Sequence, residues 1–504
     1  MQSKYNPITE GVIWKQILFF FFPMLLSSFF QQLYNTADAL IVGRIAGKEA
    51  LSAVGGSAGS VLGIFIMFYI GFSGGAAVLA AQFFGAKKEE ALQESIRSSL
   101  LLSALMGAIG SFICFGFAGP ILRLMHTPAD ILTPSLWYLR IVALGLIPNA
   151  LYNMGASLLR ATGDARRPLA VLVATCLTNI LLDLLFVAGL GLGAPGAALA
   201  TALCQLLSAL LALACLGRSA SVKDSGSVKG PGSAAVFDSL NNSASVKGSA
   251  SMDAESGTGS LPDSPITNGS ASRRLRVRGR RTDNILPRLL QMGLPLGFSE
   301  VMYTFANVIL MSVVNGFGTD TVAAYAAYGK IDAIFWMIVG SFGVAITTFV
   351  GQNMGAGKWS RVMQSIRDCA LMMFLILGIV IFLLRTFAFP LQRLFCEDPA
   401  VVEIGVRMMR FLMPFYFFYI PIEVLFGALR GMGDSVIPTL ITFFGVCVLR
   451  SCWGLFIVPL HHTVNMVLLG FPVTWVTCDL AFAVYFCLYL RRHRPVFADP
   501  VADR

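Results

Sequence analysis

Charged residues are scarce in this chain of 504 residues: 13% are Asp, Glu, Lys or Arg, while 56% are hydrophobic. A water-soluble globular protein carries about a quarter charged residues, so this composition indicates a chain embedded in a membrane. A membrane-spanning helix needs roughly 20 apolar residues, and twelve runs of suitable length can be read. They cover residues 17–42, 52–80, 96–118, 131–156, 169–190, 195–217, 288–315, 322–350, 366–388, 403–429, 437–459 and 466–490.

Sequence signatures of catalysis are also missing. The chain contains no Walker A motif, which argues against ATP as an energy source, and no GxSxG or HExxH motif. Its ten cysteines form no CxxC pair and no zinc-ligand spacing, so we expect packing residues and neither disulfides nor a metal site. No cleavable signal peptide is expected, because the N-terminus leads directly into a full-length span. These absences predict a protein that is not an enzyme and needs no cofactor.

The second half of the chain repeats the first at a spacing of about 270 residues. Repeated segments are 82–88 with 352–358, 95–97 with 365–367, 159–164 with 429–434, and the residues around Pro23 with those around Pro295. We therefore expect an all-α membrane protein with twelve transmembrane helices in two six-helix bundles, residues 1–216 and 286–492. Because each half has an even number of helices, the pseudo-two-fold axis should run along the membrane normal. Duplication of this kind is typical of alternating-access transporters that bind substrate between the halves.

Residues 217–285 form a Ser/Gly-rich linker that ends in a basic run, residues 273–281. A segment so poor in apolar residues is expected to be disordered. Residues 217–288 hold eleven Lys/Arg and six Asp/Glu, so half of the net charge of +10 lies there. Lys and Arg gather in the same set of loops as this linker and the tail, residues 493–504, which predicts that both termini are cytoplasmic. The excess charge suits an anionic leaflet better than nucleic acid.

Ionisable residues inside spans are costly and are functional candidates by default. In the N-terminal half the strongest candidates are Asp38 in the first span and Asp183 in the fifth, with Asn35 and Asn179 one helical turn before them on the same faces. Both carboxyl groups should fall in the outer half of one bundle. Burial disfavours the charged carboxylate, so such a group can take up and release a proton during transport. The alternative is that Asp38 only caps the outer end of its helix.

The C-terminal half offers a less defined set of candidates for substrate or cation contacts: Glu300, Asp332, Glu423, Tyr419, Lys330 and Arg450. Lys330 could pair with Glu300, and Arg450 with Glu423 or Asp332. A neutral structural network and a cation site therefore remain alternatives at this point. Aromatic residues crowd this half, and a few of them lining a cavity would suit flat cationic compounds.

Segments of both halves resemble the multidrug and toxic compound extrusion (MATE) family, bacterial type. The resemblance is carried by residues 34–43 with 50–54, by 341–353 and by 427–434, and it covers the chain except the linker, which is unusually long. By this resemblance, Asp38, Asn179 and Asp183 carry the coupling cation. The sodium-linked branch uses acids in the seventh and tenth helices, where Glu300 and Glu423 lie. Tyr419 stands one turn before Glu423, where that branch has an acid, which weakens a sodium site there.

The sequence and the resemblance together predict a monomeric multidrug efflux transporter of the inner membrane. It would export cationic or amphipathic small molecules by antiport with H+, with Na+ as the alternative coupling ion, through alternating access. Protonation of Asp38 and Asp183 would reshape the first helix and lower the affinity for a cationic substrate. The alternative is a flippase for lipid-linked sugars, which should have a strongly basic central cavity. The intramembrane charges are mostly acidic, which favours the exporter.

Overall fold

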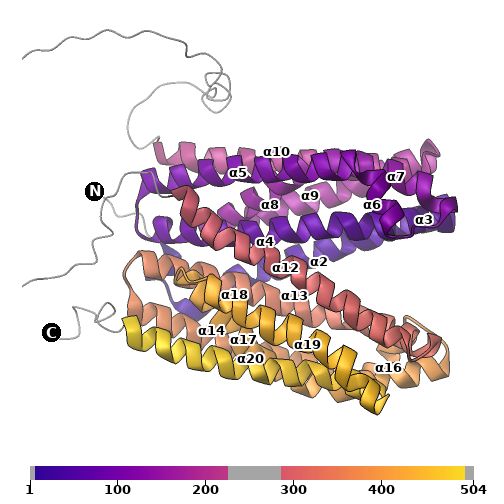
Figure 1. The fold of residues 1–504 in the computed structure, drawn as a ribbon. Coiled ribbons are helices and arrows are strands. Elements are labelled where there is room, and N and C mark those ends of the chain that lie inside the picture. The colour runs from indigo at the N-terminus through magenta and orange to yellow at the C-terminus, as the bar shows by residue number, and fades with distance from the viewer. Residues whose placement is uncertain (1–5, 225–284, 494–504) are drawn as a thin grey trace, which may run out of the picture. The chain divides into compact units, whose positions relative to one another are not determined.

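The structure is a computed structural model that describes residues 6–224 and 285–493. By compactness the chain divides into two units: Met1–Cys215 with Thr282–Arg504, and Leu216–Arg281. The first unit contains both halves of the repeat, and the account below concerns that unit (Figure 1). The linker and the tail, apart from residues 217–224, 285 and 493, lie outside the described residues.

The N-terminal half consists of five long helices or helix pairs joined by short ones, together with the span that leads into the linker. Its helices are α1 (Pro7–Glu10), α2 (Ile13–Ile41), α3 (Gly47–Gly55), α4 (Ser57–Gly85), α5 (Glu89–Gly116), α6 (Ala118–Leu124), α7 (Ala129–Leu144), α8 (Leu146–Ala161), α9 (Arg166–Asp183) and α10 (Gly193–Asp224). Helix α10 continues past residue 217, where the apolar run ends. The predicted boundary between span and linker therefore falls inside this helix.

The C-terminal half repeats this order. Its helices are α12 (Ile285–Asn315), α13 (Thr319–Gly355), α14 (Trp359–Thr386), α15 (Ala388–Arg393), α16 (Pro399–Leu412), α17 (Tyr419–Gly431), α18 (Val436–Thr442), α19 (Leu449–Cys452) and α20 (Val464–His493). In the described part of the chain, eleven helical segments are long and apolar enough to cross a membrane, or twelve if the bent pair α7–α8 is one span. The predicted all-α membrane fold is confirmed.

The fourth span is broken in both halves. Helices α7 and α8 meet at Gly145 with a bend of 47°, and α16 and α17 are joined by a 3₁₀ segment, Met413–Phe418. A side chain at Gly145 would collide with Gln205 of α10. Glycine therefore allows the bent span to lie against its neighbour.

Two helices of the N-terminal half change to π-helical geometry directly beyond their acidic residues. Helix α2 continues as a π-helical turn, Val42–Ala46, after Asp38, and α9 continues as Leu184–Gly189 after Asp183. These two π segments contact each other. Because π turns are frequently found at functional sites, this contact draws attention to the C-terminal ends of α2 and α9.

Helix α2 belongs to both halves of the molecule. Its first half, with Phe20 and Phe21, shares a buried apolar core with the C-terminal half. Phe21 stacks on Phe342 of α13 with ring centroids 4.3 Å apart, and Phe20 meets Phe349 at 6.1 Å. Its second half packs along α9 and the π segments of the N-terminal half. A division of the chain into two bundles at residue 216 follows the order of the sequence, whereas α2 packs against both halves.

The other contacts between the halves gather on α4, α12 and α13. Gly71 and Gly75 of α4 let the backbone of α12 approach closely, since a Cβ at either position would collide with the α12 main chain. Phe68 of α4 packs against Phe298 with centroids 5.5 Å apart. Close packing of small residues is the usual way in which membrane helices associate.

The end of the two bundles at which α2 begins and α20 ends is called the terminal end below (Figure 1).

Candidate transport site

Asp38 and Asp183 come together, as their positions in the sequence predicted. Their carboxyl groups interact with each other across α2 and α9. Asp183 is fully buried, and neither of its oxygens makes a well-formed hydrogen bond to another described residue. Two adjacent carboxyl groups cannot both be charged without strong repulsion, so a proton or another cation between them would be stabilised.

Asn179 lies one turn from Asp183 on the same face of α9 and is also fully buried. Its amide group lies against Cys204 of α10 and makes no well-formed hydrogen bond to another described residue. A buried amide without partners is costly. It leaves one donor and one acceptor next to the carboxyl pair for water, substrate or an ion.

A cavity of about 360 Å³ opens inside the N-terminal half, beside Asp38. Its walls come from α2, α4, α7, α8, α9 and α10. Polar lining residues are Gln31, Tyr34, Asn35, Asp38, Tyr138, Asn149, Tyr152, Asn153, Thr175, Thr201, Gln205 and Ser208, and apolar ones include Leu62, Ile66, Met67 and Ile70. Asn35 thus lines this cavity, although sequence reasoning offered only its spacing from Asp38. Asp183 is not among the lining residues and reaches the cavity through Asp38.

In the C-terminal half Asp332 is held by aromatic side chains. Tyr416 donates to Asp332 Oδ1, and Trp336 Nε1 donates to Oδ2 at 2.8 Å. Tyr328 shares a hydrogen bond with Tyr416, and Tyr419 packs edge-on against Trp336. The carboxylate charge is spread over hydrogen-bond donors, so Asp332 belongs to a polar network enclosed by rings.

The pairings considered for Lys330 and Arg450 do not form. Among the described residues no ion pair joins Lys330, which is exposed, to Glu300. Arg450 is 2% exposed and donates to Thr474 Oγ1 at 3.1 Å, while its guanidinium lies 4.3 Å from the ring centre of Phe471. Helical spacing identifies which residues share a face but not which helix lies opposite, which is why these pairings were wrong.

Glu300 and Glu423 instead face Arg430, an arginine in the last turn of α17. Its guanidinium interacts electrostatically with both glutamates. The group lies close to Gly74 of α4, where a Cβ would be 2.9 Å from Arg430 Nη2. The three charges therefore lie at the contact between the halves. The repeat of Arg160 as Arg430 was the available signal, but it does not reveal which way the side chain turns.

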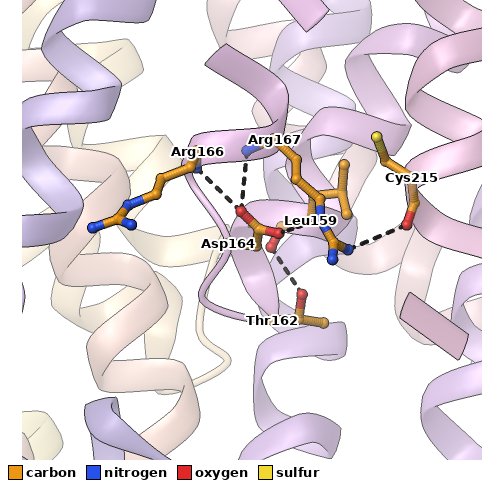
Figure 2. A network of polar contacts seen from close by, with 6 residues as sticks. All are labelled: Leu159, Thr162, Asp164, Arg166, Arg167 and Cys215. Carbon is orange, nitrogen blue, oxygen red and sulfur yellow. Dashed lines mark hydrogen bonds and ion pairs between the residues drawn. The ribbon is translucent and has the colours of Figure 1, made fainter. Parts of the chain in front are cut away.

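The loop between α8 and α9 is fixed by Asp164 (Figure 2). Its Oδ1 accepts hydrogen bonds at 3.1 Å from the backbone amides of Arg166 and Arg167, and Oδ2 pairs with Arg167 Nε at 3.1 Å. Arg167 also donates to the carbonyl oxygen of Cys215 in α10. The repeat-related Asp434 accepts a hydrogen bond from Tyr485 of α20. In both halves this aspartate ties the loop to the last helix of its own bundle.

Residues 6–224 and 285–493 contain no cluster of side chains suited to binding a metal ion. No group of three or more His, Cys, Asp or Glu side chains is placed there to hold a metal ion. The acidic side chains that do come together are the pair Asp38–Asp183 and the group of Glu300 and Glu423 around Arg430. What the site offers chemically is reversible binding of protons or small cations beside a polar cavity.

Comparison with known sequences places these features in a family. A family model described as MatE matches residues 23–185 and 295–454. The chain is 26% identical over 500 residues to a Bacillus subtilis (strain 168) protein named "Probable multidrug resistance protein YoeA", covering 97% of this chain and 96% of that protein. It is 25% identical over 445 residues to "Probable multidrug resistance protein NorM" of Thermotoga maritima, covering 86% and 84%. The matches include both halves of the repeat.

Solved structures share the fold. The structure titled "Crystal structure of MATE in the straight conformation" matches with a TM-score of 0.79 and 21% sequence identity, over 98% of this chain and 100% of that one. At this identity the match concerns the fold alone. It extends over both bundles.

Proposed function

This chain belongs to the MatE family of multidrug efflux transporters of the membrane, and from that premise we propose that it exports cationic or amphipathic small molecules in exchange for H+. The observation that carries the proposal is the pair Asp38–Asp183: Asp38 lines a cavity of about 360 Å³, and the fully buried Asp183 interacts with Asp38. A cationic substrate and a proton would compete for the negative charge of this pair. Competition for one charge is a sufficient physical basis for exchange.

The order of events follows from charge balance. With the pair negatively charged, a cationic compound in the cavity is stabilised by Asp38, while Tyr34, Asn149 and Asn153 contribute hydrogen bonds at the wall. When a proton binds to the pair, that attraction is lost and the substrate leaves. Because Asp38 and Asp183 precede the contacting π segments of α2 and α9, a change in their charge acts on a locally adjustable part of both helices.

Glu300, Glu423 and Tyr419 form a second region that can contact a cationic substrate. They lie on α12 and α17, and Arg430 interacts electrostatically with both glutamates. A substrate cation that approaches them must compete with this guanidinium. We therefore assign the coupling proton to the N-terminal pair and a secondary substrate contact to this region.

We further propose that the terminal end faces the cytoplasm of a bacterial inner membrane. Lys and Arg are concentrated in the loops of that end, including Lys87, Lys88, Arg166, Arg167 and Lys358, and cytoplasmic loops carry such an excess. Export then proceeds from the terminal end toward the opposite end.

The test is transport of a fluorescent cation such as ethidium by the purified protein in liposomes, first with an imposed pH gradient and then with a sodium gradient. We expect movement driven by the pH gradient. Asp38→Asn and Asp183→Asn should each abolish it, because the amide can neither bind the proton nor attract the cation. Asp130→Asn is the matched control, since Asp130 is an exposed acid of the same half and should leave transport unchanged.

Three results would contradict parts of the proposal. Unchanged transport in both Asp38→Asn and Asp183→Asn would exclude the pair as the coupling site. Movement under the sodium gradient alone would replace H+ by Na+. No movement under either gradient, with the protein folded and inserted, would exclude cation antiport and turn attention to the flippase.

A further inference from the structure

Two hydrogen bonds related by the internal repeat join the halves at the terminal end. Gln82 of α4 donates from Nε2 to the carbonyl oxygen of Gly431 at 2.9 Å, and Gln352 of α13 donates to that of Ala161 at 2.7 Å. Both donors and both acceptors occupy positions 270 residues apart. Each half therefore gives one glutamine to the other and receives one in return.

The acceptors are carbonyl groups that helix geometry leaves without a backbone partner. The last carbonyls of a helix have no intrahelical donor, and the turn after α8 satisfies those of Leu158, Leu159 and Arg160. Gly163 makes this turn possible with φ of +92°, and Gly433 does so after α17 with φ of +97°. In each half this turn leaves one carbonyl group without a backbone donor, that of Ala161 in the first half and that of Gly431 in the second. The glutamine of the other half donates a hydrogen bond to it.

Close approach of the helices depends on another repeated residue. A Cβ at Gly85 would collide with the carbonyl oxygen of Gln352, and a Cβ at Gly355 would collide with that of Gln82. These glycines end α4 and α13, one turn beyond the two glutamines. The two helix ends can thus meet with their backbones almost in contact, which brings the two halves together at the terminal end.

The two bonds differ because the N-terminal segment contacts Gln352. Asn6 Nδ2 donates to Gln352 Oε1 at 3.2 Å, so the amide of Gln352 is held from both sides. Lys358 Nζ donates to the carbonyl oxygen of Thr9 at 2.9 Å, and Arg361 donates to that of Gly11 at 2.7 Å. Helix α1, which directly precedes α2, is thereby fastened to the C-terminal half.

We propose that Gln82 and Gln352 form a two-fold latch that holds the terminal end closed, and that the N-terminal segment reinforces the Gln352 half of it. The inference rests on alternating access between the halves, but not on the identity of the ion or the substrate. Each bond is a neutral hydrogen bond, and loss of one such bond changes an equilibrium about fivefold. A latch of this strength can favour one state and still open in every cycle.

The distance between the halves at the terminal end tests the latch directly. Spin labels on Glu90→Cys and Ser360→Cys report it, in protein whose native cysteines have been replaced, because both positions are exposed and are related by the repeat. Gln82→Met and Gln352→Met keep the length of the side chain and remove its amide. Gln82→Met should raise the ratio of open to closed distances about fivefold, Gln352→Met should raise it further because the hydrogen bond from Asn6 is lost as well, and the double variant should raise it by the product of both effects.

Asn6 tests the reinforcement separately. Asn6→Asp keeps the acceptor that caps α1 and removes the donor to Gln352. It should increase the open fraction in the Gln82→Met variant and add nothing in the Gln352→Met variant, whose partner is already gone. Gln93→Met, at an exposed position of α5, is the matched control and should leave the distances unchanged.

Unchanged distances in the folded double variant would overturn the latch, and equal effects of Asn6→Asp in both backgrounds would overturn the reinforcement. If the double variant does not fold, the single variants and Asn6→Asp decide the question. The measurement needs neither substrate nor gradient. A failure of proton-coupled drug export would therefore leave its outcome intact, and the two failures can be told apart.

Discussion

Single glycines set how far the two halves can close. Gly85 lies where the carbonyl oxygen of Gln352 occupies the space of a Cβ, whereas a Cβ at Gly340, also in a helix, would meet nothing within 4 Å. The two residues are otherwise comparable, because neither needs a positive φ. The effect of adding one methyl group should therefore differ between them in sign.

Gly340→Ala should stabilise the protein by roughly 0.5–1 kcal/mol, because alanine loses less chain entropy in a helix. Gly85→Ala should destabilise the closed terminal end, since α4 and α13 must separate to admit the Cβ. Thermal unfolding in detergent, together with the label distances at the terminal end, measures both effects. A rise in stability for Gly85→Ala with unchanged distances would show that the close approach has no importance.

The acidic residues illustrate what can be predicted at this scale. The proximity of Asp38 and Asp183 followed from their depth in two helices that run in the same direction. The tyrosine partner of Asp332 and the threonine partner of Arg450 could not be derived, because Tyr416 and Thr474 lie on other helical segments, whereas Trp336 stands one turn after Asp332 on the same helix. Charged groups inside a membrane are expected to pair with opposite charges. Asp332 and Arg450 instead form hydrogen bonds with aromatic and hydroxyl side chains.

At the scale of elements, the loops after α8 and α17 directly follow the residues whose carbonyl groups accept the latch bonds, and Asp164 holds the first of these loops in place. Asp164 achieves this with two kinds of contact, backbone amides at the start of α9 and the guanidinium of Arg167 (Figure 2). The Arg167 side chain is 45% exposed and that of Asp164 28%. An ion pair so accessible to water contributes little, so the amide contacts should dominate.

Asparagine and alanine at position 164 separate the two contributions. Asp164→Asn keeps an oxygen for the amides of Arg166 and Arg167 and loses only the charge, so its effect on unfolding should be small. Asp164→Ala removes the cap as well and should cost about 1 kcal/mol. The comparison is made by thermal unfolding at low and high salt. Equal losses in both variants, disappearing in high salt, would mean that the ion pair dominates instead.

The elements also mark a limit of sequence reasoning. Hydropathy identified the twelve spans, because each residue contributes to it independently of its neighbours in space. The repeat showed that Gln82 is equivalent to Gln352 and Gly85 to Gly355, but equivalence does not say which residues face each other. The latch was therefore present in the sequence as a pattern and could be recognised only once α4 was seen to meet the end of α17, and α13 the end of α8.

At the scale of the whole molecule, α2 connects the two functional regions. Its second half carries Asp38 beside the cavity, while its first half packs against Phe342 and Phe349 of α13. Helix α1 precedes it and is tied to the C-terminal half at the latch. Because α2 packs against both halves, it connects the position of Asp38 with the terminal end.

If α2 transmits the charge state of Asp38 and Asp183, the latch should respond to pH. In the otherwise unaltered protein we expect the open fraction at the terminal end to change between mildly acidic and mildly alkaline conditions, because the two states of the molecule hold the proton with different affinity. The double variant Asp38→Asn, Asp183→Asn should lose this dependence, since its amides do not titrate, while Asp130→Asn should keep it. Spin-label distances recorded across the pH range provide the measurement. A pH dependence that persists in the double variant would place the sensor elsewhere, with Glu300 and Glu423 as the next groups to replace.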